Sequence, residues 1–315
     1  MYDEPMPELP EVQTTVNGLQ KRVIGRRIKA VWSSYNSPYF HGDDNIKDPT
    51  YFKTFHKAIL GQKIVSVERR AKNILINLSH GQTILIHMKM TGHLLYGTYR
   101  FNATKTVNPK DPWEPLSPPG LRDPFNRHIR LVFTLDNGKY LALSDMRKFA
   151  KVTLLETKTA LQSSHLQGLG PEPLDPAFTF EKFRAQLADR PHGKIKLVLM
   201  DQTVLSGIGN IYADESLWRA GIHPLSRVAK IPIAKQKLLY QAIRKILSAG
   251  IDLGGSSTSD YRNIDGEKGT SQEKHHAYRR TGEPCDKRGC SGHLKRITVG
   301  SRGTHFCDQH QKLFV

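Results

Sequence analysis

"KIKLVLMDQTVLSGIGNIYADESLWRAG" (residues 194–221) contains two short stretches of helical periodicity on either side of a turn with two glycines. This pattern predicts a helix, a turn and a second helix. The unpaired amides and the dipole at a helix N-terminus bind phosphates, and Asn210 stands where the second helix begins. The same spacing also fits an ordinary helical hairpin, so the pattern indicates a phosphate site without establishing one.

The next stretch, "AKQKLLYQAIRKILSAG" (residues 234–250), predicts a longer amphipathic helix that stops at Gly250. Its predicted apolar face consists of Leu238, Leu239, Ile243 and Ile246. We therefore expect a helical domain over residues 178–255.

Upstream, over residues 23–156, apolar residues recur at every second position instead of with the period of a helix. "NILINLS" alternates Ile74, Ile76 and Leu78 with mostly polar neighbours, as half-buried antiparallel strands require. The pattern predicts a β-sandwich within a first domain over residues 7–156. Residues 103–124 hold six prolines (109, 112, 115, 118, 119 and 124), so we expect a surface loop there.

Downstream, residues 256–277 have low hydrophobicity and no sustained period, which predicts a mobile loop. The last segment, residues 278–315, holds the three cysteines of the chain. Cys285 and Cys290 form one pair, and Cys307 with His310 forms a second, which suits a closed tetrahedral zinc site on two short strands. His293 and His305 are the alternative fourth ligands.

The composition limits the class of protein. The 315 residues carry a net charge of +18, divided as +8 over residues 1–177, +6 over 178–255 and +4 over 256–315. A charge spread in this way indicates a polyanion-binding cleft built from several parts. The apolar runs fall far short of the roughly 18 residues of a membrane span, and the acidic N-terminus does not suit a secretory signal. We expect an intracellular protein without membrane contact.

The N-terminal stretch "MPELPEVQTTVNGLQ" (residues 6–20) spaces Leu9, Val12, Val16 and Leu19 as one face of a helix that begins near Pro10. Pro7 and Glu8 then lie at the positive end of that helix.

"PELPEV" resembles the signature of the formamidopyrimidine-DNA glycosylases, and further motifs of that family follow in order. They are "RRAKNILINL", "IHMKMTG", "SDMRKF", "LGPEPL", "MDQTVLSGIGNIYADESLWRAGIHP", "GGSS" and "RRTGEPC". The resemblance implies an α+β multidomain fold: an N-terminal helix with an antiparallel β-sandwich, a helical domain with a helix-two-turn-helix motif, and a zinc-bound β-hairpin. It also implies a monomeric, nucleoid-associated base excision repair enzyme that excises 8-oxoguanine and formamidopyrimidines from damaged double-stranded DNA and then cleaves the strand by β,δ-elimination.

In that family the secondary amine of an N-terminal proline attacks C1′ of the damaged nucleotide, which assigns this role to Pro7. The resemblance makes Glu8 the general acid and base, Glu11 a supporting carboxylate, and Lys72 a strand-borne phosphate ligand. Two departures stand out: Ala71 replaces the usual glycine before Lys72, and six residues precede Pro7. We expect Met6 to be the true start and to be removed, because an internal proline is an amide without a nucleophilic lone pair.

The DNA-binding residues implied by the resemblance come from all three domains. Met90, Arg147 and Phe149 match the side chains that fill the space left by a flipped base. Asn210 and Arg302 match phosphate ligands. The loop over residues 256–277 matches the cover over the flipped base and contains Thr270, while Ser271 stands where many members carry an aromatic residue.

The first zinc knuckle has four residues between its cysteines where the family has two, and His310 replaces a fourth cysteine. Imidazole substitutes readily for thiolate, and Gly289 can turn the longer knuckle, so we expect one structural Zn²⁺. Two alternative functions remain open. One is an endonuclease VIII-like glycosylase for oxidised pyrimidines. The other is a non-catalytic DNA-binding protein that is blocked by the residues before Pro7.

Overall fold

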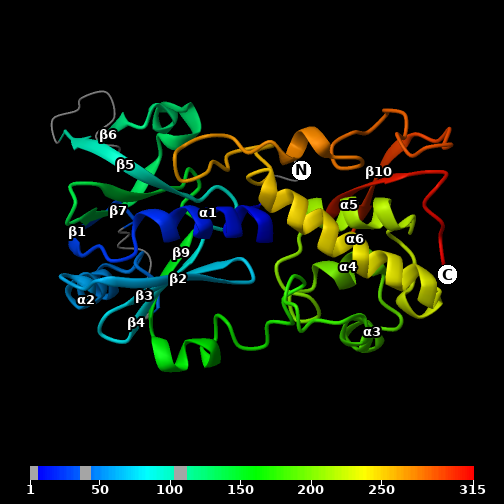
Figure 1. Ribbon diagram of the computed structural model, residues 1–315, viewed down its shortest axis with the longest axis horizontal. Helices are drawn as coiled ribbons and strands as arrows, with labels where there is room; N and C mark the ends of the chain where they lie inside the picture. The colour runs from blue at the N-terminus through cyan, green and yellow to red at the C-terminus, as the bar shows by residue number, and fades with distance from the viewer. Residues whose placement is uncertain (1–5, 36–43, 103–111) are drawn as a thin grey trace.

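The structure, a computed structural model, describes residues 6–35, 44–102 and 112–315. It has a strand-rich part at one end and a helical part with the C-terminal hairpin at the other, and α1 lies along the strand-rich part with its N-terminal end at the junction (Figure 1).

The strand-rich part is a sandwich of two antiparallel sheets. One sheet has the order β1-β7-β8-β5-β6 and the other the order β2-β3-β4-β9. The bounds of its elements are α1 Leu9–Arg22, β1 Ile28–Ser33, α2 Pro49–Ile59, β2 Ile64–Arg70, β3 Asn73–Leu78, β4 Gln82–His87, β5 His93–Phe101, β6 Trp113–Ser117, η1 Pro119–Arg122, η2 Pro124–Asn126, β7 Ile129–Leu135, β8 Tyr140–Ser144, β9 Lys151–Glu156 and η3 Thr157–Gln162. Ile74 and Ile76 lie in the core between the sheets, as their alternation predicts.

The prediction of a surface loop over residues 103–124 is wrong for its second half, while residues 103–111 lie outside the described part. Residues Trp113–Ser117 form β6, which pairs with β5 in antiparallel register. Proline is tolerated there because β6 is an edge strand, where one row of amides needs no partner. Trp113 is only 8% exposed and packs against Trp32, Phe101 and Tyr140.

Helix α1 joins the two parts of the molecule. Leu9, in its first turn, packs into the core of the helical part, whereas Val12, Val16 and Leu19 pack into the core of the sandwich. The predicted apolar face therefore serves two cores. Because the helix is buried in both, the residues at its N-terminus are fixed at the junction between the parts.

The helical part contains the predicted helix, turn and helix. Its elements are α3 Phe180–Ala188, α4 Ile195–Met200, α5 Asn210–Ala220, η4 Val228–Lys230 and α6 Ile233–Asp252. In α6 the buried face consists of Leu239, Ala242, Ile243, Leu247 and Gly250. Leu238 was predicted on that face but is 48% exposed. Residues 239, 243 and 247 are spaced about one helical turn apart and point into the core, so the side chain at position 238 points away from it.

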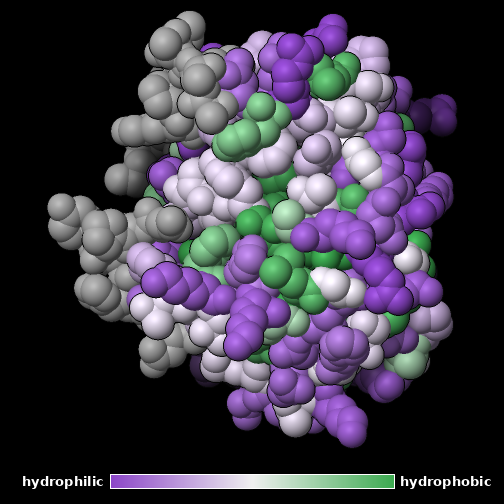
Figure 2. Space-filling view, turned by 90° about the vertical axis from the view of Figure 1, so that its left-hand side faces the viewer, coloured by the Kyte–Doolittle hydropathy of each residue, from purple (hydrophilic) through white to green (hydrophobic). Residues whose placement is uncertain are grey.

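The C-terminal residues complete the fold with η5 Ser271–Lys274 and the hairpin of β10 Leu294–Val299 and β11 Arg302–Cys307. The hairpin lies against α5 (Figure 1). Within the part of the chain that the structure covers, every helix is too short or too polar to traverse a lipid bilayer. Seen from the sandwich end, the surface is mostly hydrophilic around a central group of hydrophobic residues (Figure 2).

Candidate active site

A cavity of about 300 Å³ lies at the junction of the two parts. It is lined by Met6, Glu8, Lys72, Met90, Met200, Gln202, Ile208, Gly209, Asn210 and Arg302. Five of these residues are ones that the sequence singled out: Glu8, Lys72, Met90, Asn210 and Arg302. The fold therefore brings together side chains from α1, the sandwich, the two-helix motif and the hairpin. Pro7 is buried directly between the lining residues Met6 and Glu8.

Glu8 links α1 to the N-terminus of α5. Its carboxylate accepts hydrogen bonds from the amides of Gly209 at 2.7 Å and Ile211 at 2.8 Å. A carboxylate at a helix N-terminus is favoured both by the free amides and by the helix dipole. Gly209 is required at this point, since a Cβ there would lie 2.5 Å from the Glu8 carboxyl carbon. The carboxyl group is thus held beside Pro7 with little freedom.

Burial raises the pKa of Glu8 to about 7. The positive charge of Lys72 and the amides of α5 act in the opposite direction, so desolvation is the dominant effect. A carboxyl group with a pKa near neutrality can both donate and accept a proton, as a general acid and base must.

Glu11 lies behind Glu8 and outside the cavity. Its carboxylate accepts from the Glu8 amide at 2.8 Å, from the Tyr212 hydroxyl at 2.7 Å and from the Ser256 amide at 2.7 Å. Glu11 is 1% exposed, and burial raises its pKa. These contacts give it a supporting position, since it fixes the backbone at Glu8 and ties α1 to α5.

Lys72 follows a turn held by Glu172 of the "LGPEPL" motif. The Glu172 carboxylate accepts hydrogen bonds from the side chains of Arg69 and Arg70 and from the amide of Ala71. Lys72 itself is buried, with 6% of its surface exposed. Burial lowers the pKa of Lys72, although the neighbouring Glu8 favours its charged form. Ala71 has a φ of +54°, the left-handed region that suits glycine, which is the residue that the family resemblance predicts at this position.

Replacing Ala71 by glycine will stabilise the protein. The left-handed conformation costs an L-residue about 1–2 kcal/mol, and the extra freedom of glycine in the unfolded chain costs about 0.4–1 kcal/mol. We therefore expect A71G to raise the free energy of unfolding by roughly 0.5–1 kcal/mol, measured by urea denaturation. Ala142→Gly in strand β8 is the control and should destabilise. A loss of stability in A71G equal to that in A142G would contradict the strain at Ala71.

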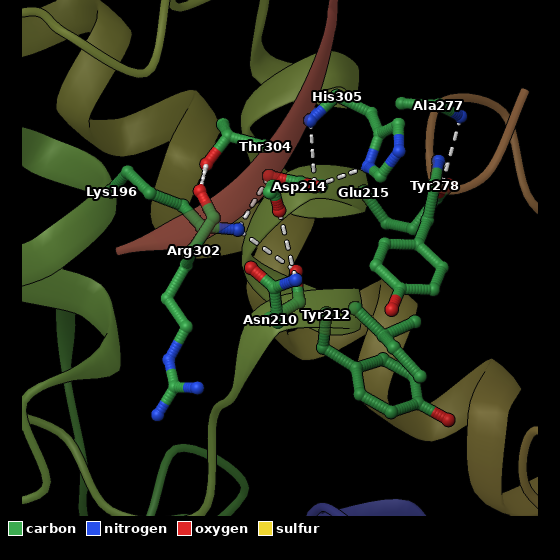
Figure 3. Close-up of polar contacts among 12 residues, drawn as sticks. Lys196, Asn210, Tyr212, Asp214, Glu215, Ala277, Tyr278, Arg302, Thr304 and His305 are labelled. Atoms are coloured by element: carbon green, nitrogen blue, oxygen red, sulfur yellow. Dashed lines mark hydrogen bonds and ion pairs between the residues drawn. The ribbon is translucent and has the colours of Figure 1, made fainter. Parts of the chain in front are cut away.

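Behind the cavity, a buried polar network joins α4, α5 and β11 (Figure 3). The Lys196 ammonium pairs with the Asp214 carboxylate, whose other oxygen accepts from the His305 amide at 2.9 Å. The Asn210 side-chain amide donates to the carbonyl of Gly303 at 2.9 Å. The hairpin is thereby fixed to the start of α5, and the Arg302 side chain extends away from the network (Figure 3) toward the cavity that it lines.

Met90, Arg147 and Phe149 come from two turns that a buried aspartate holds together. Asp145 accepts from the Thr91 hydroxyl at 2.5 Å and from the Ala150 amide at 2.8 Å. Arg147 and Phe149 are exposed, and the Arg147 guanidinium carbon lies 4.6 Å from the Phe149 ring centre. Met90 is half-buried and lines the cavity. An exposed aromatic ring with a stacked guanidinium beside the cavity suits contact with nucleobases.

Thr270 is exposed and lies outside the cavity lining, and its amide donates to the carbonyl of Leu253 at 2.9 Å. The loop that contains it has only the short helix η5, as its composition predicts. Much of it is nevertheless packed: Tyr261, Arg262 and Ile264 are each less than 5% exposed.

Cys285, Cys290, Cys307 and His310 form the predicted cluster, with ligand atoms within 4.8 Å of one another. The Cys290 and Cys307 sulfurs are 3.6 Å apart, and Cys285 Sγ lies 3.3 Å from His310 Nδ1, spacings that suit tetrahedral zinc. His310 Nε2 lies 2.9 Å from the Trp218 carbonyl, which orients the ring with Nδ1 toward the thiols.

The turn in the longer knuckle falls at Gly289, with a φ of +76°. The alternative ligand His305 contacts Asp214 instead, and His293 is outside the cluster.

Replacing His310 by alanine will remove one ligand of this cluster. We expect metal affinity to fall by more than about 100-fold, which exceeds the effect of changing an outer contact. Zinc content of the purified protein measures this, with DNA binding as a second readout. His293→Ala is the matched control and should keep a full equivalent of metal. Equal zinc content in H310A and the unmodified protein would exclude His310 as a ligand.

Several residues of the site lie in motifs quoted above but were not singled out as site residues. Tyr212 and Glu172 contact the predicted residues only because distant segments fold together. The amides of Gly209 and Ile211 carry no side-chain signature at all. Asp214 and Glu215 are charged residues in a helix that is buried on nearly all sides, and adjacent acidic residues in such an otherwise apolar stretch were the pattern that could have pointed to Asp214.

Comparison with known protein families gives two matches along the chain. Residues 6–152 match the formamidopyrimidine-DNA glycosylase N-terminal domain, and residues 169–262 match the formamidopyrimidine-DNA glycosylase H2TH domain. The first match begins at Met6.

Among curated relatives, the formamidopyrimidine-DNA glycosylase of Herpetosiphon aurantiacus is 38% identical over 96% of this chain and 98% of the relative. That of Heliobacterium modesticaldum is 36% identical over 98% of this chain and its own whole length. Among solved structures, Lactococcus lactis Fpg in complex with DNA containing an abasic site has a TM-score of 0.79 at 30% identity, covering 97% of this chain and 99% of that one. MutM in complex with DNA containing carbocyclic 8-oxoguanine has a TM-score of 0.77 at 30% identity, with 97% and 100% coverage.

Proposed function

Because this chain belongs to the formamidopyrimidine-DNA glycosylase family, we propose that the cavity at Pro7 and Glu8 is where it excises oxidised purines from duplex DNA. The protein is a base excision repair enzyme, a DNA N-glycosylase with lyase activity at abasic sites. The observation that supports this site most strongly is Glu8 itself. A buried carboxyl with a pKa of about 7 lies beside the one residue whose freed amine is the expected nucleophile.

In the first step the lone pair of the Pro7 amine bonds to C1′ of the damaged nucleotide, and the bond between C1′ and the base breaks. The base leaves with the electron pair of that bond. The N–H proton of the Pro7 nitrogen is then lost, and the departing base takes up a proton. Glu8 donates its own proton to the ring oxygen of the sugar as the nitrogen lone pair opens the ring, which leaves an iminium between Pro7 and C1′, a hydroxyl at C4′ and an ionised Glu8. The raised pKa of Glu8 supports this step, because the carboxyl keeps its proton at a pH where an ordinary glutamate is ionised.

Strand cleavage follows from the same intermediate. The iminium acidifies the hydrogens of C2′, so that loss of a proton there expels the 3′-phosphate, and a second elimination expels the 5′-phosphate. Glu8, now ionised, is in position to accept the proton. Lys72 and Arg302 line the cavity from opposite domains and suit the charge of phosphates on either side of the lesion.

The remaining groups act on the duplex. Asn210 and Arg302 are proposed phosphate contacts, and Met90, Arg147 and Phe149 are proposed to fill the gap left by the flipped base. The loop with Thr270 is proposed to cover that base. Zn²⁺ bound by Cys285, Cys290, Cys307 and His310 would stabilise the hairpin that carries Arg302, a structural contribution only. A duplex DNA substrate is in keeping with a nucleoid location.

Borohydride trapping tests this function, since reduction of the iminium leaves a stable covalent adduct. Duplexes with 8-oxoguanine, formamidopyrimidine, thymine glycol or an abasic site are incubated with the protein and borohydride. We expect adducts with both purine lesions and the abasic site. Preferential trapping on thymine glycol would indicate the pyrimidine-specific branch of the family. Tight DNA binding without any adduct would indicate a non-catalytic protein.

A further inference from the structure

The loop over residues 256–277 is attached to the sandwich by the proline-rich segment that follows β6. In Figure 1 this loop leaves the end of α6, crosses to the strands β5 and β6, and returns toward the hairpin. Its crossing part, residues 260–267, is called the arm below. The arm approaches η1 and η2 closely, and these contacts have no part in the chemistry described above.

The central contact is an ion pair across the two segments. Arg262 of the arm is 1% exposed, and its guanidinium donates to both carboxylate oxygens of Asp123 at 3.0 and 3.2 Å. The same guanidinium donates to the carbonyls of Ser259 and Tyr261 at 2.9 Å each. Its carbon lies 4.6 Å from the ring centre of Phe125. A buried guanidinium with this many partners defines one geometry of the arm.

A second set of contacts joins backbone to backbone. A Cβ on Gly120 would lie 2.6 Å from the carbonyl oxygen of Asp265, so η1 and the arm touch without an intervening side chain. The Asn126 side-chain amide bridges them by donating to the carbonyls of Gly120 at 2.9 Å and Gly266 at 3.1 Å. Asn126 is 2% exposed, so these bonds are shielded from water.

The arm is also inserted into the main core. Ile264 is 4% exposed and packs within the core of the sandwich, where it contacts α1 at Gly18. Its carbonyl accepts from the amide of Tyr96 in β5 at 2.6 Å. By contrast Glu267, Lys268 and Thr270, which follow, are exposed. The loop is therefore fixed over most of the arm and again from Gly269 to Ser271, and Glu267 and Lys268 between these two attachments face solvent.

We propose that Asp123, Asn126 and Gly120 form an anchor that holds the arm through Arg262, and that this anchor sets how well the loop covers a flipped base. The inference rests on the proposed function, in which the loop with Thr270 covers the lesion. Arg262 is a positioning residue in this scheme. A loop fixed in advance loses less conformational freedom when it closes on the base. Excision of a base depends on that cover, whereas cleavage at an abasic site, which has no base to cover, does not.

Two variants release the arm in different ways. Arg262→Met removes the ion pair but keeps an apolar chain of similar length. Gly120→Ala leaves every charge in place and separates the backbones. Arg22→Met is the matched control, because Arg22 pairs with Asp265 of the same arm but is 48% exposed. Arg262→Lys keeps the positive charge but loses the paired donors of the guanidinium. Its rates of trypsin cleavage and base excision should lie between those of R262M and the unmodified protein.

Each variant is measured in three assays: trypsin cleavage after Lys268, single-turnover excision of 8-oxoguanine, and cleavage of a preformed abasic duplex. We expect R262M and G120A to speed the trypsin cleavage about tenfold or more, since local opening controls proteolysis. Excision should fall by about tenfold or more, while abasic cleavage stays within about threefold. R22M should stay within about threefold in all three assays.

Two results overturn the anchor: unchanged trypsin cleavage in both variants, or excision and abasic cleavage that fall in parallel. The proteolysis assay requires no enzyme activity. If the unmodified protein neither excises bases nor forms a borohydride adduct, the proposed function fails, and the trypsin result still decides whether the arm is anchored.

Discussion

A form of the protein that begins at Pro7 will be trapped on an abasic or 8-oxoguanine duplex by borohydride, and a form that keeps residues 1–6 will not. In the longer form the Pro7 nitrogen is an amide and has no lone pair for C1′. Met6 also lines the cavity, so in the longer form the chain before Pro7 lies at the proposed site of reaction. Loss of an enzymatic nucleophile costs about 10⁴-fold or more in rate, so we expect the longer form to give no detectable adduct.

The two forms are prepared with a protease site placed directly before Pro7, and intact mass verifies each N-terminus. A short form with Pro7→Gly is the control, because its primary amine is still a nucleophile and should still be trapped. DNA binding of both forms is measured separately, because the proposed phosphate contacts Lys72, Asn210 and Arg302 line the same cavity as Met6. Full lyase activity in a chain with an intact Met6–Pro7 bond would exclude Pro7 as the nucleophile.

Glu8→Gln will lower the rate of base excision by about 10²- to 10⁴-fold, the usual contribution of a general acid. Glutamine keeps one acceptor oxygen for the amide of Gly209 or Ile211 but sets its NH2 group against the other amide, so thermal unfolding of E8Q is measured beside its excision rate. The pH profile gives the sharper result. Burial raises the pKa of Glu8 to about 7, and the acid form donates the proton. The excision rate of the unmodified enzyme should therefore fall tenfold per pH unit above about pH 7, and E8Q should lose this dependence.

Single-turnover rates between pH 5.5 and 9 on an 8-oxoguanine duplex, roughly spanning this pKa, measure the effect. Glu11→Gln is the matched control, because Glu11 is equally buried but lies outside the cavity. We expect E11Q to be slower than the unmodified enzyme but to keep the decline above pH 7. If E8Q kept that decline, another group would be the acid.

The sequence predicted the order of the domains because each has its own periodicity. Period two in residues 23–156 corresponds, in the described part of that segment, to nine strands that are interrupted by helix α2. The glycine turn of residues 202–209 separates α4 from α5. The spacing of the cysteines and His310 predicted the metal cluster, since both knuckles are local. The failures came from tertiary context. Prolines argued against a strand in β6, yet an edge position tolerates them. Leu238 fitted the predicted apolar face of α6, but in the structure the buried face is centred on Leu239, Ile243 and Leu247, and Leu238 is exposed.

The individual catalytic candidates also came from local motifs, but their chemistry did not. "PELPEV" identifies Glu8 as a residue of interest, whereas its pKa depends on burial against α5, some 200 positions away in the chain. The loop over residues 256–277 shows the same division, because its composition predicts irregular structure and only folding reveals the anchor at Asp123 and Arg262. Periodicity and spacing are properties of neighbouring residues, so the sequence alone determined the elements and the motifs. Desolvation, close backbone contact and ion pairing depend on what surrounds a group in space. Only the tertiary structure decided them.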